Sequence, residues 1–559
     1  MKTVKNETKK GNIFKGVFDS IFHYAKRNAY LLLVFSFIFV ITGFIAFFVT
    51  ASSDTVYSFS LTEFEIGQIA DRTIIADKDL PSEVEGDVSV SAGEKVIKKG
   101  FPITDKAMLK LQRMAETPAY IDYRGFANKI LYLMLLAVLA FLLYNPVIAV
   151  KPVSAKECVL LGVFFVCVYA IAGFCSKVAF FSSPYSLPIA IPGAFFVLLI
   201  AVMFGQVHGV IFSFILSLGV LNADVNNLIP ALFVLASGLA TTRVVRNIEQ
   251  RMDMVYVSLL LALLHVVFLV TLKIIFNDSF TGFFIQVMMI TLNGFLSGIL
   301  ALGFLTPLEN LLNTASVFRL KELSDLNSPI MKKMLVIAPG TYAHSGMVAT
   351  LAEKACLDIN ANPILARVGA YFHDLGKMDK PEYFVENQTE DNKHDDINPS
   401  LSVTIIKSHV KKGVEKAHEL RLPPEVIDII SEHHGNSLIS YFYNEAKKED
   451  DTITIEKYSY PGNPPSSKES AVVMLADSVE AACRTLTNPS VPRLEKFIHE
   501  LIMKKFDSRQ LDNSELSFRD LAKIEKSFVQ TLASHYHSRI KYPNQKDPDE
   551  LDAEDSSKN

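Results

Sequence analysis

Residues 30–50 read YLLLVFSFIFVITGFIAFFVT, a run without a single charged side chain. A helix needs about 20 apolar residues to cross the hydrocarbon core of a bilayer, which is ~30 Å thick. The run therefore predicts a membrane-spanning helix. It is longer than the ~7–15 apolar residues of a cleaved signal peptide, and the basic segment 1–29 precedes it, so we expect a permanent signal anchor.

More apolar runs follow within the first 305 residues. Five are long enough to span a bilayer (130–150, 158–176, 187–204, 255–272 and 283–305), and two are shorter (207–221 and 227–242). Counting all of them as spans gives one helix, a gap at 51–126 and a seven-helix domain at 127–305. The chain is 50% hydrophobic and 20% charged, with most of its charge after residue 305. This distribution excludes a purely soluble enzyme, a disordered chain and a pure channel.

Lys and Arg in the short loops set the expected orientation, because cytoplasmic loops carry an excess of both. The richest loops follow the second and sixth spans and contain Lys151, Lys156, Arg243, Arg246 and Arg251. They share one side of the membrane with the basic N-terminus, 1–29. That side is predicted to be the cytoplasm, so eight spans leave residues 306–559 inside and residues 51–126 outside.

The predicted outer segment, 51–126, is large enough for a small α+β fold. Residues 55–61 alternate as a strand would, and residues 88–97 read as a hairpin that turns near Gly93. A helix is expected after Pro102 with Thr104 as its N-cap. The residues show no binding chemistry, so a tethered domain and a sensor of an extracellular ligand both stay open.

Isolated polar residues lie at the predicted membrane depth. His208, His265 and Asn293 interrupt apolar runs, together with Pro188 and Pro192. No chain of acidic or basic residues accompanies them, so an ion path is not expected. For His265, packing or an interhelical hydrogen bond is the predicted role, in preference to a role in transport.

The polar half after residue 305 reads almost entirely as helix. Residues 306–335 predict a linker helix, 336–542 an all-α domain, and 543–559 an acidic disordered tail. Thr341 is expected to cap one helix, and Asn362-Pro363 to open another. The predicted fold class is therefore mainly α: a polytopic helical membrane domain, an all-α cytoplasmic domain and a small α+β extracellular segment.

Imidazole and carboxylate side chains recur on the successive helices expected in this half. The set is His344, His373, Asp374, His409, His433, His434 and Asp477. Such ligands suit Fe, Mn, Co, Ni or Zn better than Ca or Mg. Seven side chains are more than one metal ion needs, and they suffice for two ions if one carboxylate bridges the pair. Two ions about 3.5–4 Å apart can clamp both oxygens of a phosphodiester displacement, so the set predicts a two-metal phosphohydrolase.

Two nearby residues need separate interpretation. Lys377, one turn beyond Asp374, either reaches a phosphate oxygen as a catalytic residue or is a solvated cation at a helix end. A second His-Asp pair, His394-Asp395, lies in a polar stretch and is predicted to be a loop feature. The ordered set of seven residues, rather than any single His-Asp pair, points to the metal chemistry.

Several motifs together resemble a known family, the seven-transmembrane HD-domain (7TMR-HD, PgpH-type) phosphodiesterases. The motifs are APGTYAHS at 338–345, HDLGK at 373–377, YFVENQ at 383–388, NPSLS at 398–402, EHHG at 432–435 and LADSVEA at 475–481. The outer segment weakly resembles that family's extracellular HDED module at 66–70 and 93–100, although it is much shorter. The resemblance covers about residues 28–540.

The resemblance implies hydrolysis of the bacterial second messenger cyclic di-AMP to linear pApA at a di-iron or di-manganese centre. It implies that His344, His373, Asp374 and Asp477 hold one ion, and that Asp374 bridges to a second held by His409, His433 and His434. It further implies a multi-pass protein of the bacterial inner membrane, regulated through its membrane or outer part. No other cofactor is expected, and a homodimer is compatible with this arrangement.

Other functions remain open at this stage. An HD phosphohydrolase acting on cyclic di-GMP or (p)ppGpp is the main alternative, although the Gly-Tyr-Pro of the cyclic di-GMP class is absent after His433-His434. A non-catalytic membrane receptor would predict missing ligands, and none of the seven is missing. The net charge of −4 at pH 7 argues against a nucleic-acid polymer as partner.

Overall fold

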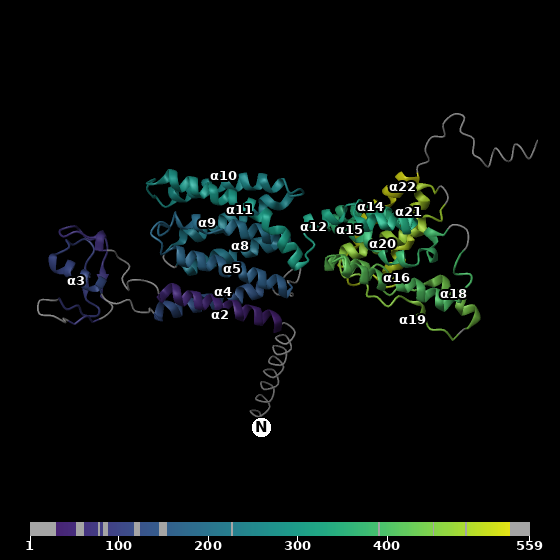
Figure 1. The fold of residues 1–559 in the computed structure, drawn as a ribbon, viewed down its shortest axis with the longest axis horizontal. Helices are drawn as coiled ribbons and strands as arrows, with labels where there is room; N and C mark the ends of the chain where they lie inside the picture. The colour runs from purple at the N-terminus through teal and green to yellow at the C-terminus, as the bar shows by residue number, and fades with distance from the viewer. Residues whose placement is uncertain are drawn as a thin grey trace, which may run out of the picture. The chain divides into compact units, whose positions relative to one another are not determined.

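The computed structural model divides into two compact units, 1–306 and 307–559. It describes residues 29–51, 61–76, 79–81, 88–116, 123–144, 154–224, 227–388, 392–450, 452–486 and 489–536. Helices dominate these residues, and their one sheet has two strands (Figure 1). The mainly α fold is thus confirmed. Residues 1–28 of the basic N-terminus, residues 55–60 of the expected strand and the acidic tail lie outside the described residues.

The apolar runs of the first unit are helical over nearly all of their described residues, and one of them is divided between two helices. Among the described residues, six helices are long and apolar enough to cross a membrane: α2 (Ala29–Ala51), α4 (Tyr123–Tyr144), α5 (Ala155–Cys175), α8 (Gln206–Ala223), α10 (Asp253–Ile275) and α11 (Phe283–Leu312). Three are shorter: α6 (Leu187–Ala190), α7 (Gly193–Phe204) and α9 (Leu228–Val244). The longer helices lie side by side with similar axes (Figure 1). The chain is a multi-pass membrane protein, and α8 is longer than its sequence suggested.

One predicted span is not a continuous helix. The run 187–204 breaks between α6 and α7 at Pro192, whose ring cannot donate a backbone hydrogen bond. The side-chain amide of Asn293 on α11 donates to the carbonyl oxygens of Ile189 at 2.9 Å and Ile191 at 3.3 Å. Asn293 thus makes interhelical hydrogen bonds, and its acceptors are backbone carbonyl groups next to the break.

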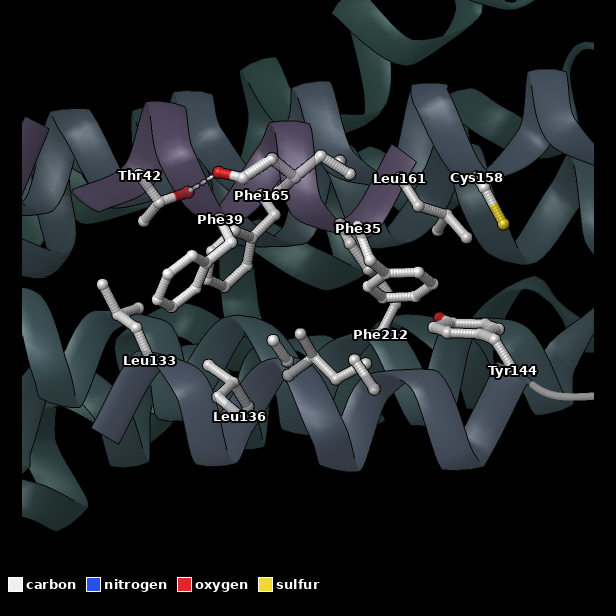
Figure 2. Close-up of a pocket in the computed structure, with 15 residues that line it drawn as sticks. Phe35, Phe39, Thr42, Leu133, Leu136, Tyr144, Cys158, Leu161, Phe165 and Phe212 are labelled. Atoms are coloured by element: carbon white, nitrogen blue, oxygen red, sulfur yellow. Dashed lines mark hydrogen bonds between the residues drawn. The ribbon is translucent and has the colours of Figure 1, made fainter. Parts of the chain in front are cut away.

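The N-terminal membrane helix packs closely on its neighbours. Gly162 on α5 faces Ile38 of α2 so closely that a side chain at this position would clash, as is common where small residues let membrane helices approach. Helices α2, α4, α5 and α8 line an apolar cavity, with the Tyr144 hydroxyl and Cys158 at one end (Figure 2). The same view shows the Thr42 hydroxyl bonded to the Ile38 carbonyl within α2.

The small domain between α2 and α4 has a different strand pairing from that predicted. Its elements are η1 (Leu61–Glu63), β1 (Ile74–Ile75), β2 (Lys95–Ile97) and α3 (Asp105–Glu116). Residues 88–97 do not form a hairpin, because β2 pairs with β1 and Val90 bridges to Leu80. Gly93 does turn the chain, with φ +80°. The Thr104 hydroxyl accepts a hydrogen bond from the amide of Ala107 at 3.2 Å, so the predicted cap of α3 is confirmed.

The segment predicted as one linker helix is part of the second unit. Helix α11 ends at Leu312, and two further helices follow, α12 (Val317–Leu323) and α13 (Pro329–Ile337). Leu320, Met331 and Met334 are at most 1% exposed and pack in one cluster with Phe372. A single linker helix at 306–335 is therefore wrong: the chain breaks twice, and its apolar face belongs to the core of the second unit.

The remaining helices of the second unit surround the histidine set. They are α14 (Pro339–Asp358), α15 (Pro363–Phe372), η3 (Leu375–Asp379), η4 (Pro381–Tyr383), η5 (Val385–Asn387), α16 (Pro399–Glu419), α17 (Pro424–Glu432), α18 (Ser440–Glu449), α19 (Ile455–Tyr458), α20 (Lys468–Cys483), α21 (Val491–Asp507) and α22 (Phe518–Tyr536). Asn362 caps α15 as predicted, accepting from the Leu365 amide at 3.1 Å. Thr341 is not a cap, because α14 already begins at Pro339.

Candidate metal centre

All seven side chains of the predicted ligand set meet in the second unit. They come from different elements: His344 from α14, His373 and Asp374 from the end of α15, His409 from α16, His433 and His434 from the end of α17, and Asp477 from α20. Six of the seven residues are buried, and His434 is half-buried. Positions separated by more than a hundred residues therefore converge on one site.

Asp374 lies between two groups of histidines. Its Oδ2 atom is 3.2 Å from Nε2 of His373 and 3.7 Å from Nε2 of His344. Its Oδ1 atom is 3.4 Å from Nε2 of His409 and 3.8 Å from Nε2 of His433. The two oxygens of one carboxylate thus face separate sets of imidazole nitrogens, which is the arrangement that a bridging carboxylate needs.

The donor atoms form two clusters, each of a size that suits one cation. In each cluster the nearest ligand atoms lie within 4.8 Å of one another: His344, His373 and Asp477 in the first, and His409, His433 and His434 in the second. Within the described residues, Nε2 of His373 and Oδ1 of Asp374 are buried without a hydrogen-bond partner. Buried polar atoms rarely lack a partner, so these donor sets fit two metal ions.

Hydrogen bonds at Nδ1 fix the orientation of the imidazole rings. Nδ1 of His373, His409 and His433 donates to the carbonyl oxygen three residues earlier in the chain, at 2.7, 2.5 and 2.7 Å. A carbonyl can only accept, so Nδ1 carries the hydrogen and Nε2 keeps its lone pair towards the centre. His344 differs, because its Nδ1 is bonded to the carboxylate of Glu480. Such outer partners orient metal ligands.

Burial and neighbouring charges set the protonation states of the clustered side chains. Burial would raise the pKa of Asp374, but His373 and Lys377 outweigh that effect and hold it well below its usual range. Burial lowers the pKa of His409 to about 4 and that of His433 to about 3. At neutral pH the carboxylate of Asp374 is therefore ionised and the imidazoles of His409 and His433 are neutral, the protonation states that bind metal ions.

His344 has the opposite tendency. Burial opposes its protonation, but hydrogen bonds to Asp477 and Glu480 raise its pKa to about 10. Its Nε2 atom lies 3.1 Å from Oδ1 of Asp477. A metal ion at this cluster would have to displace that proton.

Lys377 is largely, though not fully, buried within the site. Its side chain is 12% exposed, and its Nζ atom lies 2.7 Å from Oδ2 of Asp374 and 2.8 Å from Oε1 of Glu386. Burial would lower the pKa of Lys377, but the two carboxylates raise it. The alternative of a solvated cation at a helix end is therefore wrong.

Two acidic residues of the site were not singled out from the sequence, Glu386 and Glu480. Glu480 lies one turn after Asp477 on α20, so its helical spacing could have indicated it. Glu386 belongs to η5 and accepts from the Thr341 hydroxyl at 3.0 Å, a tertiary contact that no spacing reveals. Glu480 contacts His344, a member of the set, whereas Glu386 contacts Lys377, which is not one of the seven.

A pocket of about 800 Å³ opens beside the centre and is lined in part by aromatic rings. The rings of Tyr460 and His434 stack with centroids 4.3 Å apart. His394 lies in a turn, as expected of a loop feature, but it also lines this pocket, and its Nε2 lies 2.8 Å from the carbonyl oxygen of Tyr383. The sequence interpretation had left His394 outside the site.

Comparisons with known proteins agree with this architecture. The model for "7TM receptor with intracellular HD hydrolase" matches residues 125–316, and the model for "HD domain" matches residues 341–482. The cyclic-di-AMP phosphodiesterase PgpH of Bacillus subtilis is 40% identical over 57% of this chain and 45% of its own length. The PgpH of Listeria monocytogenes is 31% identical over 82% of this chain and 65% of its own length.

A solved structure is also similar in sequence. The crystal structure of the L. monocytogenes PgpH HD domain in complex with cyclic-di-AMP is 41% identical and covers 38% of this chain and 100% of its own, with a TM-score of 0.37. This chain spans only 45% and 65% of the length of the two curated relatives. The two family models match in tandem, and the chain belongs to the family described as 7TM receptors with an intracellular HD hydrolase.

Proposed function

We propose that the protein is a membrane-bound, metal-dependent phosphodiesterase that hydrolyses cyclic di-AMP to linear pApA. The observation that carries the proposal is Asp374, whose two oxygens face two separate histidine clusters. The similarity to relatives named cyclic-di-AMP phosphodiesterases supports the choice of substrate.

The proposed cofactors are two divalent transition metal ions, Fe or Mn. One would be held by His344, His373, Asp374 and Asp477, and the other by Asp374, His409, His433 and His434. When bound, two such ions activate a water molecule and neutralise charge on the phosphodiester under attack. The buried donor atoms without partners support this assignment.

Lys377 has two proposed tasks in this site. Its ammonium group compensates the buried charge of Asp374 and holds that carboxylate in place. It also lines the pocket, from which it would donate a hydrogen bond to a phosphate oxygen. Glu386 fixes the lysine from the opposite side and is a positioning residue.

The proposed topology follows the distribution of basic loops. We place the N-terminus and the HD domain in the cytoplasm of a bacterial cell and residues 51–126 outside, so that the membrane helices connect an outer domain to the enzyme. Regulation through that outer domain, an extracellular ligand and a homodimer stay predictions.

One experiment tests the proposal and its alternatives. The full-length protein, in detergent or nanodiscs, is stripped of metal and reloaded with Mn²⁺ or, without oxygen, with Fe²⁺. Cleavage of cyclic di-AMP, cyclic di-GMP and ppGpp is then compared at equal concentrations. We expect cyclic di-AMP to be cleaved fastest, and only after reloading. Equal or faster cleavage of a guanine compound would contradict the substrate, and turnover in the stripped protein would contradict the metal centre.

A further inference from the structure

A second pocket, of about 770 Å³, lies next to the candidate active site and is lined by Lys407, Lys504 and Lys505. Tyr460 and Ser478 line this lysine pocket and the active-site pocket alike. The two pockets therefore meet at Tyr460, the residue that stacks on His434. A ligand bound at the metal centre can extend past this tyrosine.

Lys505, on α21, is a half-buried cation in this pocket. Its Nζ atom donates to the hydroxyl of Ser437 at 3.0 Å, and no ion pair with a carboxylate is recorded for it among the described residues. Burial lowers the pKa of Lys505, although the negative charge of Asp477 acts in the opposite direction. A buried charge is costly without a counter-ion, so an anionic ligand would complete this site.

Lys407 supplies a second cation from α16, two residues before His409. Its Nζ atom donates to the backbone carbonyl of Lys457 at 2.7 Å, and no carboxylate is recorded within ion-pair distance in the described part of the chain. Glu456 is the acidic residue on the lining, while the remaining polar side chains are hydroxyls and amides. The pocket thus combines two cations that lack acidic partners with neutral hydrogen-bond donors, a composition that suits a phosphate group.

The substrate of the proposed function carries two phosphodiester groups, and a single two-metal centre acts on one of them at a time. We propose that the lysine pocket binds the second phosphodiester of the cyclic dinucleotide, with Lys505 and Lys407 as its phosphate-binding residues. This inference rests on the proposed function. It gives a role to Lys505 and Lys407, two cations without acidic partners that the carboxylates and histidines of the metal centre do not need as counter-ions.

Hydrogen bonds also connect this pocket to one of the proposed metal ligands, His434. Ser437, which accepts from Lys505, donates its backbone amide to the carbonyl oxygen of His434 at 3.1 Å. A change at Lys505 could therefore disturb His434 instead of removing a phosphate contact. The experiment must separate these two effects.

The test compares two substrates of the full-length, Mn²⁺-loaded protein. Cyclic di-AMP has two phosphodiesters, whereas bis(p-nitrophenyl) phosphate has one and cannot use a second phosphate site. Lys505→Gln and Lys407→Gln are each expected to raise KM for cyclic di-AMP about tenfold or more, since each removes a charged hydrogen bond, with a much smaller change in kcat. The ratio of kcat/KM for cyclic di-AMP to that for the single-phosphate substrate should fall by a similar factor.

Lys496→Gln is the matched control, because Lys496 lies on the same helix and its side chain is 81% exposed; its kinetics should equal wild type. Lys505→Arg should restore most of the affinity. An equal loss of kcat/KM on both substrates would assign Lys505 to positioning His434. An unchanged KM for cyclic di-AMP in both glutamine variants would exclude a phosphate site. Either result overturns this inference but leaves the proposed function intact. A wild-type protein that cleaves only the single-phosphate substrate would overturn the proposed function as well.

Discussion

Glu480 accepts a hydrogen bond from Nδ1 of His344, whereas three other histidines of the centre use backbone carbonyls for the same purpose. Glu480→Ala removes this carboxylate, and outer partners of this kind typically contribute 10–100-fold in metal affinity. We therefore expect weaker metal binding by about that factor, with Glu480→Gln intermediate because its amide oxygen still accepts. Metal content after dialysis against graded chelator measures the effect.

The matched control for that measurement is Glu500→Gln, because Glu500 is an exposed acid paired with Lys496 on α21. It should retain the wild-type metal content at every chelator concentration. If Glu480→Ala behaves like this control, the carboxylate does not orient a ligand.

The chain offers two His-Asp pairs that can be compared directly. Asp374→Asn should reduce kcat at least about a thousandfold, the equivalent of roughly 4 kcal/mol, because it removes the proposed bridge between the ions. Asp395→Asn alters an aspartate that accepts from the side chain of Asn392, outside the ligand clusters, and should keep full activity. Turnover and metal stoichiometry are measured on the same preparations. Two bound ions and near-normal turnover in Asp374→Asn would exclude a bridging role.

The histidine pKa values predict how the metal-free protein responds to acid. The pKa of His409 is about 4 and that of His433 about 3, against about 6.5 in an unfolded chain. The unfolded state thus binds more protons below pH 6.5, and stability falls as the pH is lowered from there, by up to about 1.4 kcal/mol per pH unit for each histidine. His344 acts in the opposite direction: its raised pKa keeps it protonated in the folded protein, so its stabilising contribution declines as the pH rises through about 6.5 and offsets about one of the two lowered histidines.

Hydrogen exchange checks that response in the chelator-treated, full-length protein. After correction for intrinsic exchange rates, amides of α16 and α17 should open more readily at pH 5.5 than at pH 7.5. His409→Asn should show a shallower dependence, because one of the titrating groups is gone. Protection that is equal or greater at pH 5.5 would contradict the buried neutral imidazoles.

The packing of α13 predicts a stability effect outside the site. Met334 is fully buried in a cluster with Phe372, whereas Val336, two residues later, is 81% exposed. Met334→Ala should destabilise the second unit by about 2–5 kcal/mol, and Val336→Ala by much less. Resistance to proteolysis in denaturant measures both. Equal effects would mean that this segment is a linker after all.

The convergence of the seven side chains was predictable because each is a chemically distinctive residue and their order along the chain is informative. His344 and Asp477 are far apart in sequence, yet their places in the ordered set marked them both. The residues around this set were harder to predict from the sequence. Glu386 lies in a short irregular segment, and its role depends on where Lys377 points, which only tertiary packing decides.

Strand pairing and helix continuity were harder to foresee for the same reason. Residues 88–97 look like a hairpin because they contain a turn at Gly93, but their partners lie earlier in the chain, at Leu80 and β1. The prediction of a single linker helix was wrong because the apolar periodicity gives no sign of the breaks after α11 and α12. Local patterns indicated the elements, and long-range contacts determined how they join.

The break between α6 and α7 has a consequence for biogenesis. The carbonyl oxygens of Ile189 and Ile191 receive their hydrogen bonds from Asn293, a residue that the ribosome adds about a hundred positions later. A backbone carbonyl left without a partner in hydrocarbon is costly. The insertion machinery must therefore keep this segment shielded, or in contact with water, until α11 is synthesised, and assembly of the membrane half is completed by its last helix.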